Sequence, residues 1–165
     1  RIVIDRDVLA EEFYGCSDGT TTGYMLGYLN NSKSVFVTNA VTHAKKLALQ
    51  GNKVILIEGE LKGSTEALVG GYAAASLKKF HFTKGFFGTN GLTKKAGFTT
   101  PDTSEALVKN KAMEQCKECY VLVDQSKFDK ISPVTFQQFG RATIITERKP
   151  EGYMECENII VVREN

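Results

Sequence analysis

The sequence has no apolar stretch close to the roughly 20 residues that a membrane-spanning helix needs. It also has no run of lysines and arginines of the kind that tracks a nucleic-acid backbone. We therefore expect no membrane segment and no nucleic-acid binding by this chain itself. The apolar run within Arg1–Asp5 is too short for a signal peptide, so we expect a cytoplasmic protein.

Cysteine and histidine are scarce, with four and two residues respectively. Cys116 and Cys119 have the CxxC spacing that zinc sites and redox dithiols share, but Cys16 and Cys156 supply no second close pair. We interpret the pair as buried thiols in a reducing compartment, with zinc or dithiol chemistry as the alternative. Neither histidine has a partner at a catalytic spacing, so we assign no catalytic residue, metal ligand or cofactor.

What remains is the composition of an ordinary globular domain, 42% hydrophobic and 24% charged over 165 residues. A chain of this length buries roughly 70% of its unfolded surface, which is enough for a full core. No internal repeat, proline-rich linker or low-complexity segment interrupts it. We therefore expect residues 1–165 to form a single domain.

Short apolar runs alternate with segments of helical periodicity. We predict strands at 35–37, 54–57, 82–87, 120–123, 142–146 and 159–162, and helices at 23–29, 40–49, 66–80 and 103–116. Thr103 or Ser104 is expected to cap the last helix, and Glu105 and Lys109, one turn apart, to form an ion pair on its solvated face. The alternation predicts an α/β fold, a mainly parallel sheet covered by helices on both faces.

Polar loops follow two of the predicted strands. Gly88–Gly91 comes after the strand at 82–87, and Asp124–Lys127 comes after the strand at 120–123. Because ligands gather beyond the carboxyl ends of parallel strands, these loops predict a pocket for a small anion. Lys127 is a lone cation there and is suited to pairing with an anionic group; a solvated surface lysine is the alternative.

A third polar loop, Asp18-Gly19-Thr20-Thr21-Thr22, precedes a segment of helical spacing. Backbone amides, threonine hydroxyls and the positive end of the helix dipole together favour a phosphate or sulfate at such a place. Simple capping of the helix by one threonine is the alternative. Thr38 and Asn39, at the end of another strand, can donate to a ligand or merely close a turn.

The order of these motifs resembles the C-terminal effector domain of the DeoR family of bacterial transcription repressors. The resemblance runs from about Asp18 to Ile145. The matching segments are DGTTT (18–22), TNA (38–40), GELKGSTEALVGGYAAASL (59–77), KGFFGTNGL (84–92), GFTTPD (97–102), EALVKNKAM (105–113) and VDQSKF (123–128). The ordered set is far more specific than any one segment.

The resemblance implies a fold similar to ribose-5-phosphate isomerase, glucosamine-6-phosphate deaminase and CoA transferases, and a phosphorylated sugar as effector. It implies that residues 18–22 hold the phosphate and that Lys127 lies at the pocket. The residues implied to line the sugar are Thr38, Asn39, Gly88, Thr89 and Asn90. Those implied to form the rim are Thr99, Thr100, Asp102 and Glu105.

The family carries an N-terminal winged helix-turn-helix that binds operator DNA, and no such segment is present in this sequence. We therefore expect a sensor part of a longer, homo-oligomeric repressor of carbohydrate metabolism. Together with the Lys- and Asn-rich composition, the family suggests a phosphotransferase-linked sugar, such as lactose or galactose through tagatose 6-phosphate, or fructose.

The alternative is a sugar-phosphate isomerase or deaminase in which Lys127 and a carboxylate shuttle protons. Against it, Thr89 and Asn90 stand where isomerase relatives have acidic residues.

Overall fold

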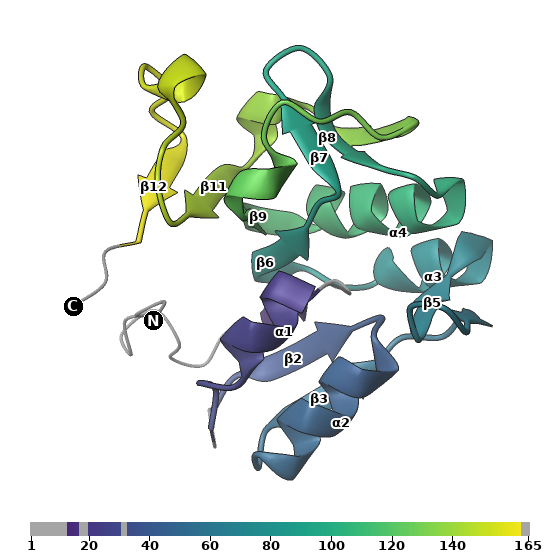
Figure 1. The fold of residues 1–165 in the computed structure, drawn as a ribbon. Coiled ribbons are helices and arrows are strands. Elements are labelled where there is room, and N and C mark those ends of the chain that lie inside the picture. The colour runs from purple at the N-terminus through teal and green to yellow at the C-terminus, as the bar shows by residue number, and fades with distance from the viewer. Residues whose placement is uncertain (1–12, 17–19, 31–32, 163–165) are drawn as a thin grey trace.

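The main sheet contains seven parallel strands in the order β12-β11-β9-β6-β1-β2-β3 (Figure 1). The computed structural model describes residues 13–16, 20–30 and 33–162, apart from the side chains of residues 13–16, 20 and 21. The strand bounds are β1 Phe13–Cys16, β2 Val35–Thr38, β3 Lys53–Leu56, β6 Phe82–Gly88, β9 Cys116–Leu122, β11 Thr143–Thr146 and β12 Ile159–Val161. The predicted parallel sheet is confirmed.

Helices cover both faces of this sheet, as predicted. They are α1 Thr20–Leu26, α2 Val41–Leu49, α3 Gly70–Leu77 and α4 Thr103–Glu114. One core, on the side of α1 and α2, contains Met25, Leu26, Leu29, Phe36, Leu47, Phe86 and Leu122. The larger core, on the side of α3 and α4, includes Val37, Leu77, Phe87, Val108, Met113 and Val121. The alternation along β2 and β6 sends successive apolar side chains to opposite cores, because side chains on a strand point to alternate faces.

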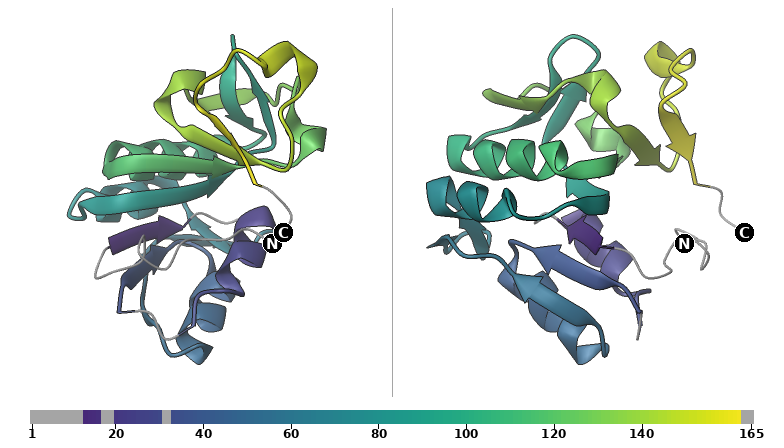
Figure 2. Two further views of the ribbon diagram at one scale, coloured as in Figure 1. Left: turned by 90° about the vertical axis from the view of Figure 1, so that its left-hand side faces the viewer. Right: turned by 180° about the vertical axis from the view of Figure 1, so that it is seen from behind.

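Two small antiparallel sheets flank the main one. A hairpin is formed by β4 Glu60–Lys62 and β5 Ala67–Val69, and a three-stranded sheet by β7 Gly91–Thr93, β8 Gly97–Thr100 and β10 Val134–Gln137. Short 3₁₀ turns lie at Gln125–Lys127, Phe139–Arg141 and Glu151–Tyr153. The three-stranded sheet and the α2–β3 unit lie at opposite ends of the molecule (Figures 1 and 2).

The helix predicted at 66–80 is wrong in its first turn, where the structure has β5 instead. Tertiary hydrogen bonds hold this segment extended: the backbone N–H of Leu68 donates to the Asn39 carbonyl at 2.7 Å, and that of Val41 donates to the Glu66 carbonyl at 3.0 Å. Gly70, with φ of +90°, then turns the chain into α3. The apolar residues keep a helical spacing through 66–80, but hydrogen bonds to distant segments hold residues 67–69 as a strand, and the helix begins only at Gly70.

The predictions for α4 also need correction. Its N-cap is Asp102, whose carboxylate accepts from the Glu105 backbone N–H at 2.9 Å, and not Thr103 or Ser104. Glu105 and Lys109 are both buried and do not pair with each other; they contact Lys62 and the Gly88 carbonyl respectively. The side that sequence spacing indicated as solvated is therefore packed against the rest of the domain.

Cys116 and Cys119 both lie in β9, so the helix predicted at 103–116 is wrong at its last residue. Both thiols are buried, and neither forms a disulfide. They donate to carbonyls of α4, Cys116 to Ala112 at 3.1 Å and Cys119 to Met113 at 3.5 Å. These contacts fit the interpretation as packed apolar thiols.

Candidate functional site

Four parallel strands bring their carboxyl ends to one edge of the sheet. Cys16, the last residue of β1, is in register with Thr38 of β2 and Phe86 of β6, and Gly88 of β6 is in register with Leu122 of β9. From β1 the chain continues to β2 and β3 on one side, whereas β6 continues to β9 on the other. The β1/β6 pair is therefore the topological switch point, where open α/β sheets bind ligands.

The predicted phosphate-binding loop, residues 18–22, lies partly outside the described residues. Asp18 and Gly19 are not among them, and for Thr20 and Thr21 only the backbone is described. That backbone forms the first turn of α1, directly beyond the edge at which β1 ends. The Thr22 side chain is 0% exposed, and its hydroxyl has no hydrogen-bond partner among the described residues. The role of residues 18–22 in binding phosphate stays a prediction.

Thr38 and Asn39 reach this edge, and both are engaged in local structure. The Thr38 hydroxyl accepts from the backbone N–H of Ala40 at 3.1 Å, and the Asn39 side-chain amide donates to the Leu68 carbonyl at 3.2 Å. Asn39 thus fastens the β4–β5 hairpin to the end of β2. Of the two readings that the sequence left open, these hydrogen bonds favour turn closure, although both residues also line the hollow described below.

The loop after β6 carries Gly88, Thr89 and Asn90. The Thr89 hydroxyl points back to the Gly91 and Thr99 carbonyls, at 2.8 and 3.0 Å, and so closes the turn. Asn90 is exposed; its side-chain oxygen accepts from the Thr100 hydroxyl at 3.2 Å. Within the described chain no hydrogen bond engages the Asn90 side-chain N–H₂ group, which leaves it available to a ligand oxygen.

Thr99 is a structural residue. It is 0% exposed, and its hydroxyl donates to the Gly91 carbonyl at 3.1 Å and accepts from the Ser132 backbone N–H at 2.9 Å. These bonds tie three segments together behind the loop that carries Asn90. The structure thus places Thr99 under the rim and not on it.

A polar network lies at the rest of the predicted rim, where Thr100 and Glu105 are also buried, at 0% and 6% exposed. The Thr100 hydroxyl lies 3.4 Å from Glu105 Oε2, and Lys62 Nζ donates to Glu105 Oε1 at 2.8 Å and to Asp102 Oδ2 at 3.0 Å. The pKa of Lys62 is raised, chiefly by the hydrogen bond to Glu105 and then by that to Asp102. The pKa of Asp102 is lowered, first by the Glu105 backbone N–H and then by Lys62. Lys62 thereby ties the β4–β5 hairpin to the start of α4.

We expect Lys62→Met to lower the free energy of unfolding by about 1 kcal/mol near neutral pH, because these partly exposed ion pairs are lost. The lowered pKa of Asp102 means that its contribution is present above about pH 4 and is lost as the pH falls through the folded-state value. Because the pKa of Lys62 is raised, its contribution to stability is fully present below pH 10.5, the ordinary value of a lysine pKa. Urea unfolding from pH 3 to pH 9 measures the difference.

Lys45→Met is the matched control, because Lys45 is exposed and the charge change is the same. Equal effects of the two substitutions would contradict a stabilising role for the Lys62 ion pairs. So would a Lys62→Met effect that stays unchanged below pH 4.

Lys127 lies at the end of a 3₁₀ turn beyond β9, with its side chain 36% exposed. Its ammonium is 3.9 Å from Asp124 Oδ2. The next residue, Phe128, is buried, packs edge-on against Tyr153, and bridges to Leu92 of β7. Lys127 is thus carried by an anchored segment at the same edge of the sheet, partly open to solvent.

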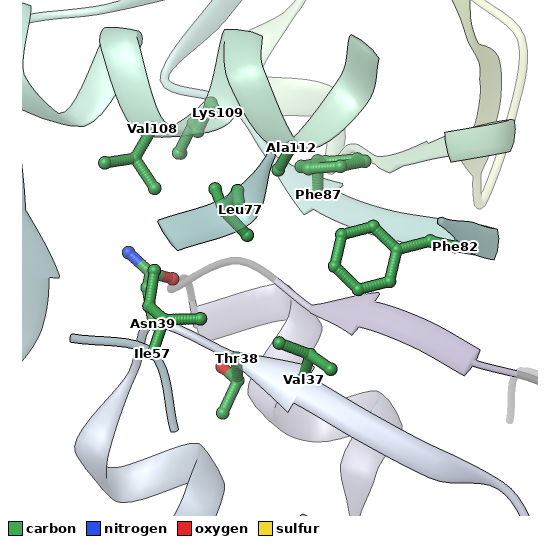
Figure 3. Close-up of a pocket in the computed structure, with 10 residues that line it drawn as sticks. All are labelled: Val37, Thr38, Asn39, Ile57, Leu77, Phe82, Phe87, Val108, Lys109 and Ala112. Atoms are coloured by element: carbon green, nitrogen blue, oxygen red, sulfur yellow. The ribbon is translucent and has the colours of Figure 1, made fainter. Parts of the chain in front are cut away.

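A small, mostly apolar hollow lies near these loops, between the sheet and the α3–α4 pair. Figure 3 shows Val108, Lys109 and Ala112 of α4 on one side of it and the end of β2 on the other. Its lining residues are Val37, Thr38, Asn39, Ile57, Leu77, Phe82, Phe87, Val108, Lys109 and Ala112. Most are apolar, and the polar atoms come from Thr38, Asn39 and Lys109.

Sequence reasoning missed Lys62 and Lys109. No sequence pattern pointed to Lys62, because its partners Asp102 and Glu105 lie 40 and 43 residues further along the chain. For Lys109 there was such a pattern. It lies three residues after Ala106 and four before Met113, on the buried stripe of α4, so helical periodicity indicates that it points inward.

Among solved structures, the chain is similar in fold to ribose 5-phosphate isomerase A. It matches the enzyme of Methanocaldococcus jannaschii with a TM-score of 0.52 and 11% identity, covering 74% of this chain and 49% of that one. The Neisseria gonorrhoeae enzyme gives 0.53 and 13% identity, covering 77% and 49%. The chain therefore has an α/β fold of the kind found in ribose 5-phosphate isomerase A.

The family follows from the sequence match. The "DeoR C terminal sensor domain" model matches residues 15–148, and the chain belongs to this family. It is 45% identical over 150 residues to the "Uncharacterized HTH-type transcriptional regulator FruR" of Bacillus subtilis, covering 88% of this chain and 60% of the relative. It is 34% identical over 134 residues to the B. subtilis "HTH-type transcriptional regulator IolR", covering 80% and 53%.

A third relative is the "Lactose phosphotransferase system repressor" of Staphylococcus aureus, 32% identical over 147 residues, covering 87% of this chain and 56% of the relative. The chain thus spans 53% to 60% of the length of these three regulators. Among the helices described, none combines the length and apolar character that a membrane span requires.

Proposed function

We propose that this sensor domain binds a phosphorylated sugar at the carboxyl edge of its sheet, and that binding controls operator recognition by a helix-turn-helix segment of the same protein. The observation that carries the proposal is that the carboxyl ends of β1, β2, β6 and β9 lie at one edge of the sheet, around the β1/β6 switch point. The regulatory names of the relatives support the role in transcription.

In this proposal residues 18–22 receive the phosphate, and Thr38, Asn39, Gly88, Thr89 and Asn90 surround the sugar. Lys127 approaches from the β9 side, and Thr100, Asp102 and Glu105 form the rim, with Thr99 supporting it from behind. The exposed side-chain N–H₂ group of Asn90 is suited to donating to a sugar hydroxyl. Regulation then requires that the ligand bind more tightly to one state of the whole regulator than to the other.

We further propose that the domain senses its ligand without turning it over. An isomerase needs a positioned base near the sugar carbonyl, and the loop after β6 offers only Thr89 and Asn90. Glu105 and Asp102 both hydrogen-bond to Lys62, which occupies these carboxylates in holding the β4–β5 hairpin. A cytoplasmic, homo-oligomeric repressor is the setting that this function suggests.

A thermal-shift screen with phosphorylated and parent sugars tests the proposal. A sugar phosphate at about 100 times its dissociation constant adds about 2.7 kcal/mol, or roughly 5–10 °C in midpoint for a domain of this size. Tagatose 6-phosphate, fructose 1-phosphate and fructose 6-phosphate are the first compounds to try. We expect at least one to stabilise the domain and its unphosphorylated parent to leave it unchanged.

Equal stabilisation by the parent sugars would contradict a phosphate site at residues 18–22. The same compounds are assayed for isomerisation and for ammonia release. Sustained turnover that disappears in Lys127→Ala would favour the isomerase or deaminase function and overturn the sensor proposal.

A further inference from the structure

Lys109 is a buried cation next to the proposed site. It is 4% exposed, in the middle of α4. Its ammonium donates to the Gly88 carbonyl at 3.0 Å and lies 5.4 Å from the centre of the Phe136 ring. Neither contact carries a full negative charge. An ammonium has three N–H donors, and among the described residues this one donates to a single oxygen, that of Gly88.

The other lysines near the site are arranged differently. Lys62 already pairs with two carboxylates, Asp102 and Glu105, and Lys127 is 36% exposed with Asp124 at 3.9 Å. In the described part of the chain no carboxylate lies within ion-pair distance of Lys109 Nζ. A charge buried without a counterion is destabilising, so its presence calls for an explanation beyond packing.

The position of Lys109 supplies that explanation. Gly88 ends β6 at the switch point, directly before Thr89 and Asn90. Lys109 also lines the hollow that is bordered by Thr38 and Asn39, at the end of β2 (Figure 3). The ammonium therefore reaches the proposed site from the α4 side of the sheet, opposite the side on which α1 packs.

We propose that Lys109 is a cation that contacts the phosphate group of the effector from the α4 side, with its two remaining N–H donors directed to phosphate oxygens while the third stays on Gly88. This inference rests on the proposed function and adds to it a specific residue and a ligand class, a phosphate monoester dianion. It also links the ligand to α4, whose first turn holds the β4–β5 hairpin through Lys62.

The test compares the unsubstituted chain with Lys109→Met, which keeps the length of the side chain and removes its charge. Lys111→Met is the matched control: it lies on the same helix, changes the net charge equally, and pairs outward with Glu114. Two quantities are measured for each: the urea midpoint without ligand, and calorimetric affinity for inorganic phosphate and for the sugar phosphate that stabilises the unsubstituted chain most.

We expect Lys109→Met to bind both phosphate compounds roughly 10- to 100-fold more weakly, because charge-assisted hydrogen bonds are lost. We also expect its ligand-free urea midpoint to stay the same or rise, since an unpaired buried charge has been removed. Lys111→Met should leave both affinities unchanged. This combination separates a ligand-binding residue from one that merely holds Gly88.

Undiminished phosphate affinity in Lys109→Met would overturn the role of Lys109 and leave the sensor proposal intact. A lowered urea midpoint together with unchanged affinity would assign Lys109 a structural role instead. If neither inorganic phosphate nor any sugar phosphate binds the unsubstituted chain, both this inference and the proposed function are wrong.

Discussion

Gly97→Ala is expected to lower the free energy of unfolding by about 3–5 kcal/mol, a large part of the roughly 5–15 kcal/mol that holds a domain together. Gly97 has φ of +73°, a conformation that side chains with a Cβ disfavour. A Cβ built there would lie 2.2 Å from the Gln137 carbonyl oxygen. Because that atom is backbone in the paired strand β10, it cannot rotate away.

The structure of the small sheet explains why the neighbour cannot yield. β10 is irregular between Thr135 and Gln137, where it passes Phe98 of β8. Phe98 is fully buried and stacks on Phe136, with ring centroids 6.1 Å apart. Moving β10 to admit a methyl group would separate these rings as well as the strands.

Gly140→Ala is the control for this prediction. Gly140 has no positive φ, and a Cβ there would meet nothing within 4 Å. Urea unfolding of the two variants should therefore differ by most of the Gly97→Ala effect. Equal and small losses would show that β8 and β10 separate easily and that the packing at Gly97 is not as tight as its geometry indicates.

The main sheet was predictable because its strands are apolar, short and separated by helical segments. Apolar runs at 35–37, 54–57 and 82–87 lie in or overlap strands of the structure. Strands buried on both faces carry a strong signal of this kind. The prediction that the polar loops lie at one edge followed from the parallel sheet, because the carboxyl ends of parallel strands share an edge.

The small strands were not predictable in the same way. β7 and β8 are three and four residues long and contain glycine and threonine, and no strand was predicted in either segment. β10 follows Pro133 and includes an irregular pairing with β8. Such strands form because β7, β8 and β10 pair with one another over α4, and this pairing leaves no periodic trace in the sequence.

The candidate site likewise has a part that the sequence predicts and a part that it does not. The loop positions followed from strand ends, and the end of β6 carries Asn90 to the rim. The partners of Glu105 and Lys109 did not follow: the periodicity of α4 places Lys109 on its buried side, but the spacing of the two residues also suits an ion pair between them. The hairpin that supplies Lys62 decides between these arrangements, and it docks through contacts distant in sequence.

Gly91→Ala is expected to disrupt the site itself. A Cβ there would lie 2.4 Å from the Lys130 carbonyl oxygen, so β7 must move away from the segment that follows Lys127. Asp129 N–H donates to the Leu92 carbonyl at 3.0 Å across this contact. We expect a loss of about 2–3 kcal/mol in unfolding free energy from the overpacking.

The more telling consequence of Gly91→Ala concerns the ligand. Gly91 directly follows Asn90, and its carbonyl accepts from the hydroxyls of Thr89 and Thr99. Displacing it moves the loop after β6 relative to the segment that carries Lys127. Calorimetry at low temperature, where the variant stays folded, should show affinity for the stabilising sugar phosphate at least about tenfold weaker.

Gly97→Ala separates this local effect from general loss of stability. Gly97 pairs with Thr93 at the turn end of the β7–β8 hairpin, whereas Gly91 pairs with Thr99 at the end next to Asn90. Both substitutions strain the same hairpin, yet only the one at position 91 alters the spacing between the two binding loops. Affinity should therefore fall in Gly91→Ala and persist in folded Gly97→Ala. Equal losses of affinity in the two variants would mean that binding depends on the whole small sheet, and that the loops after β6 and β9 are not the local determinants proposed here.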